Sequence, residues 1–177
     1  MRNFVLFGLL FSLYAFGAFG ADDVAGAVVA TVKTVDKGAK TVAVKTAEGT
    51  DETFHFVGRT VAHGARATGN ASKDAFLGMK EGDEVIVHYT VKGTVKTAEE
   101  IDHIGKDGLK ASVVVVKSVD HGAKTVAVKT ADGGEETYHL SARAVKEAGT
   151  GLEKAGKVTV YYTEDAGKKV AHYFKAS

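Results

Sequence analysis

The sequence contains no cysteine, no proline and no tryptophan among its 177 residues. Without cysteine the chain has no disulfides and no thiol for lipid attachment, so its stability must come from apolar burial and backbone pairing. Aromatic residues make up only 8% of the chain, and five of the nine phenylalanines lie within the first 20 residues. Few rings therefore remain for stacking on bases or sugars.

The chain also lacks an excess of either charge. It has 23 Lys and Arg against 22 Asp and Glu. Loss of Arg2 with the leader segment described next leaves 22 of each, a net charge of 22 − 22 = 0. Binding to nucleic acid through its phosphates needs a positive face. The composition therefore carries no strong nucleic-acid signal.

The first residues have the three parts of a secretory signal peptide. Arg2 supplies the positive charge, and residues 4–19 carry no charge. Ala18 and Gly20 place small residues at positions −3 and −1 of a cut before Ala21. The apolar run is shorter than the ~20 residues that span a bilayer. We therefore predict a signal peptide over residues 1–20, export to the periplasm or secretion, and no transmembrane span after cleavage.

One stretch of sequence occurs twice, 84 positions apart. Residues 36–47 read DKGAKTVAVKTA and residues 120–131 read DHGAKTVAVKTA. After the third strand the copies diverge, and the shift falls from 84 to 73 because the first copy is 11 residues longer there. The repeat predicts two domains, at residues 24–104 and 111–177.

Each copy has the pattern of short strands joined by glycine turns. In each turn after the first strand, Asp36 or Asp120 should bond its own downstream backbone, and the following glycine should supply the positive φ that closes the hairpin. In the first copy we predict strands at 28–35, 41–46, 53–57, 84–90 and 95–104, with counterparts in the second. Short helices are predicted at 73–79, after Ser72, and at 142–148, between Ser141 and Gly149.

The order strand, strand, strand, short helix, strand, strand is typical of the OB-fold, a five-stranded barrel. We therefore predict an all-β protein of two five-stranded barrels, with an SH3-like barrel as the alternative closure. The link between the copies, residues 102–112, is short and contains Ile104 and Leu109. We expect the two barrels to pack against each other at this link.

The same sequence pattern is similar to that of a known group of domains. A valine-rich first strand, an Asp-x-Gly turn, a Thr-Val-x-Val strand and the stretch Gly-Asp-Glu-Val-Ile-Val at residues 82–87 resemble exported bacterial OB-like domains of unknown function. The second copy departs from it, because it reads Gly156, Lys157 and Val158 where the Asp would stand. The resemblance implies a bacterial cell envelope and transfers no catalytic residue and no cofactor.

Histidine offers the candidate ligands for a metal, because neutral imidazole binds Zn, Cu or Ni. We name His55, His139 and His88 as candidates. His55 and His139 occupy equivalent positions on the third strand of each copy, and His88 can approach His55 only if strands three and four are neighbours. No His-x-His or His-x3-His spacing occurs, and a solvated polar strand face is the alternative interpretation. The seven histidines are His55, His63, His88, His103, His121, His139 and His172.

No catalytic constellation emerges. None of the serines lies in a Gly-x-Ser-x-Gly elbow, and the adjacent acids 51–52 and 135–136 point to opposite faces of a strand. We therefore expect a non-enzymatic protein that binds an unidentified envelope component or has a structural role. An oligosaccharide- or nucleic-acid-binding OB module and a histidine-based metal binder are the alternatives.

Overall fold

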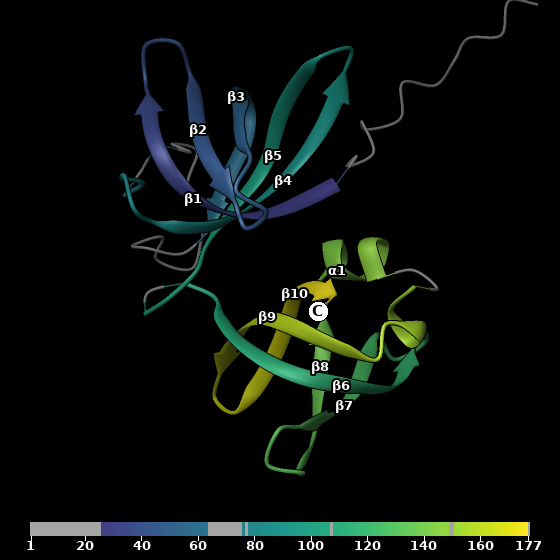
Figure 1. Ribbon diagram of the computed structural model, residues 1–177. Coiled ribbons are helices and arrows are strands. Elements are labelled where there is room, and N and C mark those ends of the chain that lie inside the picture. Colours follow the sequence, from purple (N-terminus) through teal and green to yellow (C-terminus); the bar gives the residue numbers. More distant parts are fainter. Residues whose placement is uncertain (1–25, 64–75, 77, 107, 149–150, 177) are drawn as a thin grey trace, which may run out of the picture.

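The computed structural model describes residues 26–63, 76, 78–106, 108–148 and 151–176. Ten strands form two closed barrels, which we call the first barrel (β1 to β5) and the second barrel (β6 to β10). Figure 1 shows the two barrels joined by the segment between β5 and β6. The predicted signal peptide and most of the predicted helix 73–79 lie outside the described residues. No helix in the described part of the chain is long and apolar enough to cross a membrane.

The first barrel has the strand order β1-β2-β3-β5-β4 and closes by pairing β4 with β1. All its neighbours are antiparallel except β3 and β5, which run parallel. This order, with the parallel pair, is that of the OB-fold rather than an SH3-like barrel. The strands are β1 (Gly26–Asp36), β2 (Thr41–Thr46), β3 (Asp51–His63), β4 (Glu84–Lys92) and β5 (Val95–His103).

The second barrel repeats this topology, with the order β10-β8-β7-β6-β9 and a parallel pair of β8 and β10. Its helix α1 (Ala142–Ala148) has the predicted bounds and begins after Ser141, whose Oγ accepts a hydrogen bond from the Ala144 N–H at 3.1 Å. The other elements are β6 (Lys110–Asp120), β7 (Thr125–Thr130), β8 (Glu135–Leu140), η1 (Leu152–Lys154), β9 (Lys157–Asp165) and β10 (Lys168–Ala176). The predicted all-β fold of two five-stranded barrels is confirmed.

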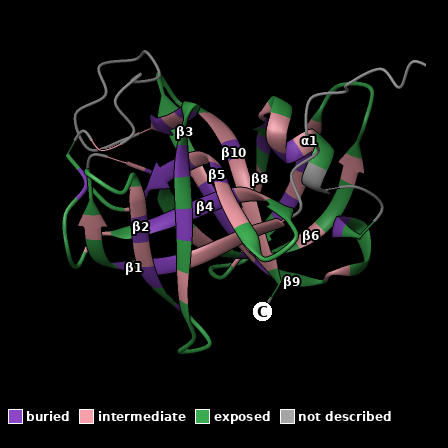
Figure 2. Cartoon of the chain, turned by 90° about the horizontal axis from the view of Figure 1, so that it is seen from above, coloured by how far each residue is buried: buried purple, intermediate pink, exposed green. Residues whose placement is uncertain are grey.

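The repeated valines fill the interior of both barrels, as the alternation along the strands predicts. Val42 and Val44 of β2 are fully buried in the first barrel, and Val126 and Val128 of β7 occupy the same positions in the second. Figure 2 shows buried positions along the strands, interrupted by exposed ones, and mostly exposed positions at the turns. The two cores are separate clusters, one for each barrel.

In the turn between the first two strands of each barrel, the predicted aspartate hydrogen bond is confirmed, but the predicted role of glycine is not. Asp36 Oδ1 accepts a hydrogen bond from the Ala39 N–H at 2.8 Å, and Asp120 does the same for Ala123. The prediction that glycine supplies the positive φ is wrong, because the left-handed residues of these turns are Lys40 and Lys124, both at φ 54°. The following turns do place glycines there, with Gly49 at 85° and Gly133 at 89°.

One lysine in each barrel forms the same set of contacts, with one carboxylate and two aromatic rings. In the first barrel the Lys96 Nζ lies 2.8 Å from Glu52 Oε1, and 5.2 Å and 5.8 Å from the ring centroids of Tyr89 and Phe54. The ammonium group is thus held by a carboxylate and by the faces of two rings. The equivalent set of the second barrel consists of Lys169, Glu136, Tyr138 and Tyr162.

Substitution of Glu136 by Gln should make the free energy of unfolding fall less steeply as the pH is lowered. Hydrogen bonds from Lys169 and Tyr138 lower the pKa of Glu136. A carboxyl whose pKa is lower in the folded than in the unfolded state stabilises the fold above the unfolded value and loses this contribution as the pH falls. Between about pH 5 and pH 3, urea midpoints of the wild type should therefore fall more steeply than those of Glu136→Gln. Parallel profiles, or an equal effect of Glu135→Gln at the exposed neighbour, would contradict this expectation.

Candidate functional site between the two barrels

Part of the outer face of β4 and β5 is buried as completely as the inner face. Val85 and Val87 point into the first barrel, but Ile86, between them, and His88, after them, are also 0% exposed. Ile86 packs outside the barrel, in a third cluster with Leu109 of the link and Tyr161 of the second barrel. The two barrels therefore pack against each other through this face, as the apolar link predicted.

Asp102 lies at the centre of the buried outer face. It is 0% exposed, and its carboxylate oxygens accept no hydrogen bond from the described part of the chain. Its neighbours across the strands are His63 of β3 on one side and Ile86 of β4 on the other. A buried carboxylate without hydrogen bonds is costly unless a cation compensates it. Asp102 is therefore the residue of this interface at which a bound cation would be most stabilising.

Two side chains bring further ligand atoms next to Asp102. One ligand atom each of His63, Glu100 and Asp102 lies within 4.8 Å of the other two. His63 Nε2 is 3.5 Å from Glu100 Oε1. The pleat produces this cluster, because Glu100 and Asp102 are two residues apart on β5 and share a face, while His63 pairs with Asp102 on the parallel strand β3.

His88 approaches Asp102 from the other side. Its Nε2 lies 3.3 Å from Asp102 Oδ2, and both side chains are completely buried. His88 pairs with Glu100 across β4 and β5, so it stands on the same outer face. The imidazole is thus placed to orient the Asp102 carboxylate from behind, as partner groups outside a metal's own ligands commonly do.

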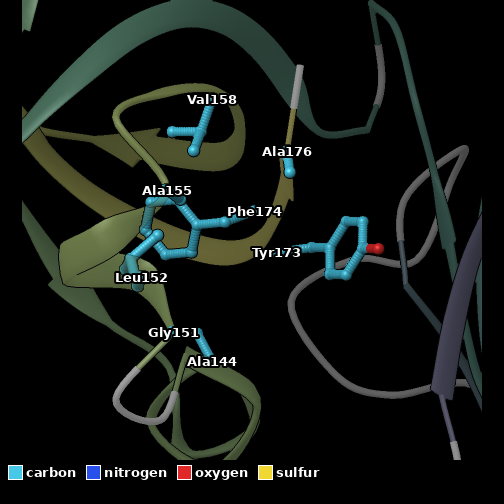
Figure 3. Close-up of a pocket in the computed structure, with 8 residues that line it drawn as sticks. All are labelled: Ala144, Gly151, Leu152, Ala155, Val158, Tyr173, Phe174 and Ala176. Carbon is cyan, nitrogen blue, oxygen red and sulfur yellow. The ribbon is translucent and has the colours of Figure 1, made fainter.

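The second barrel covers this cluster. The Nε of Arg143, in the first turn of α1, donates to Glu100 Oε2, and the Tyr173 ring stands perpendicular to the His88 ring at a centroid distance of 5.8 Å. Figure 3 shows that Tyr173 and the next residue, Phe174, point to opposite sides of β10. Phe174 faces an apolar pocket of about 210 Å³ that it shares with Leu152 and Val158.

Burial affects the titration of two further histidines near this interface. Burial lowers the pKa of His172, against the opposing effect of the Asp102 and Glu100 carboxylates. Burial also lowers the pKa of His103, against the opposing effect of Asp83 and Asp102. Both imidazoles therefore favour the neutral form, in which a ring nitrogen can accept a hydrogen bond or bind a metal. His172 Nε2 lies 3.0 Å from Thr163 Oγ1.

Two tyrosines of the second barrel at this interface occupy the repeat positions of His88 and Glu100. With the shift of 73, the counterparts of His88 and Glu100 are Tyr161 and Tyr173. The registers agree, since His88 pairs with Glu100 and Tyr161 pairs with Tyr173. One face of the repeated barrel thus carries ionisable groups in the first copy and stacked tyrosine rings in the second, with centroids 6.1 Å apart. The face of the first barrel that carries His88 and Glu100 packs against the face of the second barrel that carries Tyr161 and Tyr173.

The candidate ligands named from the sequence are not brought together. His55 and His139 lie on exposed faces of β3 and β8, in separate barrels. The condition for His88 to approach His55 is not met, because β5 lies between β3 and β4. Among the three candidates, His88 alone adjoins the buried cluster.

Sequence reasoning missed His63, Glu100, Asp102 and the covering Arg143. Spacing could not reveal them, because they come from β3, β5 and α1 and meet only through the parallel pair and the contact between barrels. A signal was present in the repeat. Positions 88, 100 and 102, which are His, Glu and Asp in the first copy, are Tyr161, Tyr173 and Lys175 in the second. Such divergence on an outward face indicates a specialised surface.

No family model matches this chain, and no curated protein is significantly similar to it. Chains of solved structures do match. One of them, described as the crystal structure of Ag(I)CusF, aligns with 44% of this chain and 93% of its own, at 15% sequence identity and a TM-score of 0.33.

Proposed function

We propose that the protein is an exported, non-enzymatic tandem OB-barrel protein that binds a divalent transition metal between its two barrels. The observation that carries the proposal is Asp102, a fully buried carboxylate that accepts no hydrogen bond from the described residues and lies beside the ligand atoms of His63 and Glu100. Export to a bacterial cell envelope is supported by the predicted signal peptide over residues 1–20 and by the resemblance of the repeat.

The donor set favours a particular class of metal. One imidazole nitrogen and two carboxylates suit Zn²⁺ and its neighbours in the first transition series. Soft monovalent cations prefer thiolates and thioethers. The sequence has no cysteine, and Met79 is buried in the core of the first barrel. We therefore assign His63, Glu100 and Asp102 as ligands and His88 as the residue that orients Asp102.

Binding requires a contraction of the cluster. Zinc lies about 2.0–2.2 Å from nitrogen and oxygen ligands, so two ligand atoms of a tetrahedral site are about 3.3–3.6 Å apart. The three ligand atoms are already within 4.8 Å of one another. Three protein ligands leave at least one position open for water or another small molecule. The proposal assigns no reaction to that position.

Calorimetric titration of the full mature chain with zinc chloride tests the proposal. We expect one zinc ion per chain, and at least about a 100-fold loss of affinity in Asp102→Asn, because even a residue that only orients a ligand contributes up to about that factor. The double variant His55→Ala/His139→Ala is the control and should bind as the wild type does. The proposal fails if the wild type gives no heat, or if the control loses binding while Asp102→Asn keeps it.

A further inference from the structure

A cation already occupies the edge of the proposed metal site. Arg143 donates through its Nε to Glu100 Oε2, and the other oxygen of that carboxylate faces His63 at 3.5 Å. The Glu100 side chain is 13% exposed and the Arg143 side chain 25%, so water screens the pair only in part. The pair also crosses between barrels, since Glu100 belongs to β5 and Arg143 to α1.

We propose that Arg143 is the resident cation of the metal-free site, and that a metal ion binds by displacing the Arg143 guanidinium from Glu100. This inference rests on the proposed metal function and deepens it, because it names the residue that sets the affinity. Glu100 has two oxygens, of which one is bound to Arg143, and a divalent ion held beside it repels a guanidinium at hydrogen-bond distance. Metal binding is then an exchange of cations on one carboxylate.

The exchange has a consequence for the second barrel. Arg143 is the second residue of α1, which packs against β10 through the buried Ala144. Among the described residues, the ion pairs that join the two barrels are Arg143 with Glu100 and Lys175 with Glu48, the latter at 3.8 Å. Release of Arg143 therefore breaks the closer of these two ion pairs. Metal binding to Glu100 thereby changes the contacts of α1.

Zinc titration of Arg143→Gln tests the inference. Gln keeps a polar side chain but removes the charge, and a nearby like charge typically shifts an ionic equilibrium by a factor of ten or more. We expect about tenfold tighter zinc binding in Arg143→Gln. Arg59→Gln is the matched control, because Arg59 binds the adjacent Glu99 at 2.8 and 2.9 Å, and it should leave the affinity unchanged.

A second readout needs no variant of Arg143. In the wild type, the nuclear magnetic resonance signal of the Arg143 Nε–H should move when zinc is added, and it should stay in place in Asp102→Asn. If zinc binds the wild type, but Arg143→Gln has the wild-type zinc affinity and this signal does not move, the inference is overturned and the metal function stands. If the wild type binds no zinc at all, both the metal function and this inference fail.

Discussion

Substitution of Asp102 by Asn should stabilise the metal-free protein while it abolishes the response to zinc. The wild-type carboxylate is fully buried and accepts no hydrogen bond from the described residues, and such a group costs about 1–3 kcal/mol or more. Asn has the same shape without the charge. We therefore expect the free energy of unfolding without metal to rise by about 1–3 kcal/mol.

Zinc should stabilise only the wild type and so offset the stability advantage of Asp102→Asn. A ligand that binds only the folded state at 100 times its dissociation constant adds about 2.7 kcal/mol, and Asp102→Asn should gain none of it. Urea unfolding with chelator and with zinc measures both effects. The control is Asp83→Ala, because Asp83 Oδ2 accepts a hydrogen bond from the Lys80 N–H at 2.8 Å and the loss of this bond should destabilise the fold. A lower metal-free stability of Asp102→Asn would show that the buried carboxylate serves the fold rather than a ligand.

Truncation of Ile86 to Ala should loosen the contact between the barrels. Ile86 is 0% exposed and packs with Leu109 and Tyr161 outside either barrel core. Loss of a buried isoleucine side chain costs about 2–5 kcal/mol. We expect this loss in urea unfolding, together with an increased radius of gyration in small-angle X-ray scattering.

Ile101→Ala provides a comparison of the same chemistry. Ile101 is equally buried but lies in the core of the first barrel. Its truncation should cost a similar free energy and leave the radius of gyration unchanged, because the outer face is not altered. Identical scattering of the two variants would contradict the role of Ile86 as a contact between barrels.

The repeat made the barrels predictable. The alternation at Thr41–Thr46 and the helix between Ser141 and Gly149 could be found from local pattern, because strand period and helix capping depend on neighbouring residues. The choice between OB and SH3-like closure depended on the parallel pairing of β3 with β5. That pairing joins residues some 40 positions apart, such as His63 and Asp102, and no local pattern reports it.

The candidate site escaped prediction for a related reason. The alternation in β4 places Val85 and Val87 in the core and Ile86 and His88 on the outside. It could not show that the second barrel covers this outside face. The polar residues of β5 therefore looked like solvated positions, whereas Asp102 is fully buried.

Anomalous X-ray diffraction at the zinc absorption edge, from crystals of the mature chain grown with one equivalent of zinc, locates the bound ion directly. We expect a single strong peak bounded by His63, Glu100 and Asp102, with Arg143 withdrawn from Glu100. Anomalous peaks confined to exposed histidines such as His55 and His139, with the Arg143–Glu100 pair intact, would contradict a metal site between the barrels.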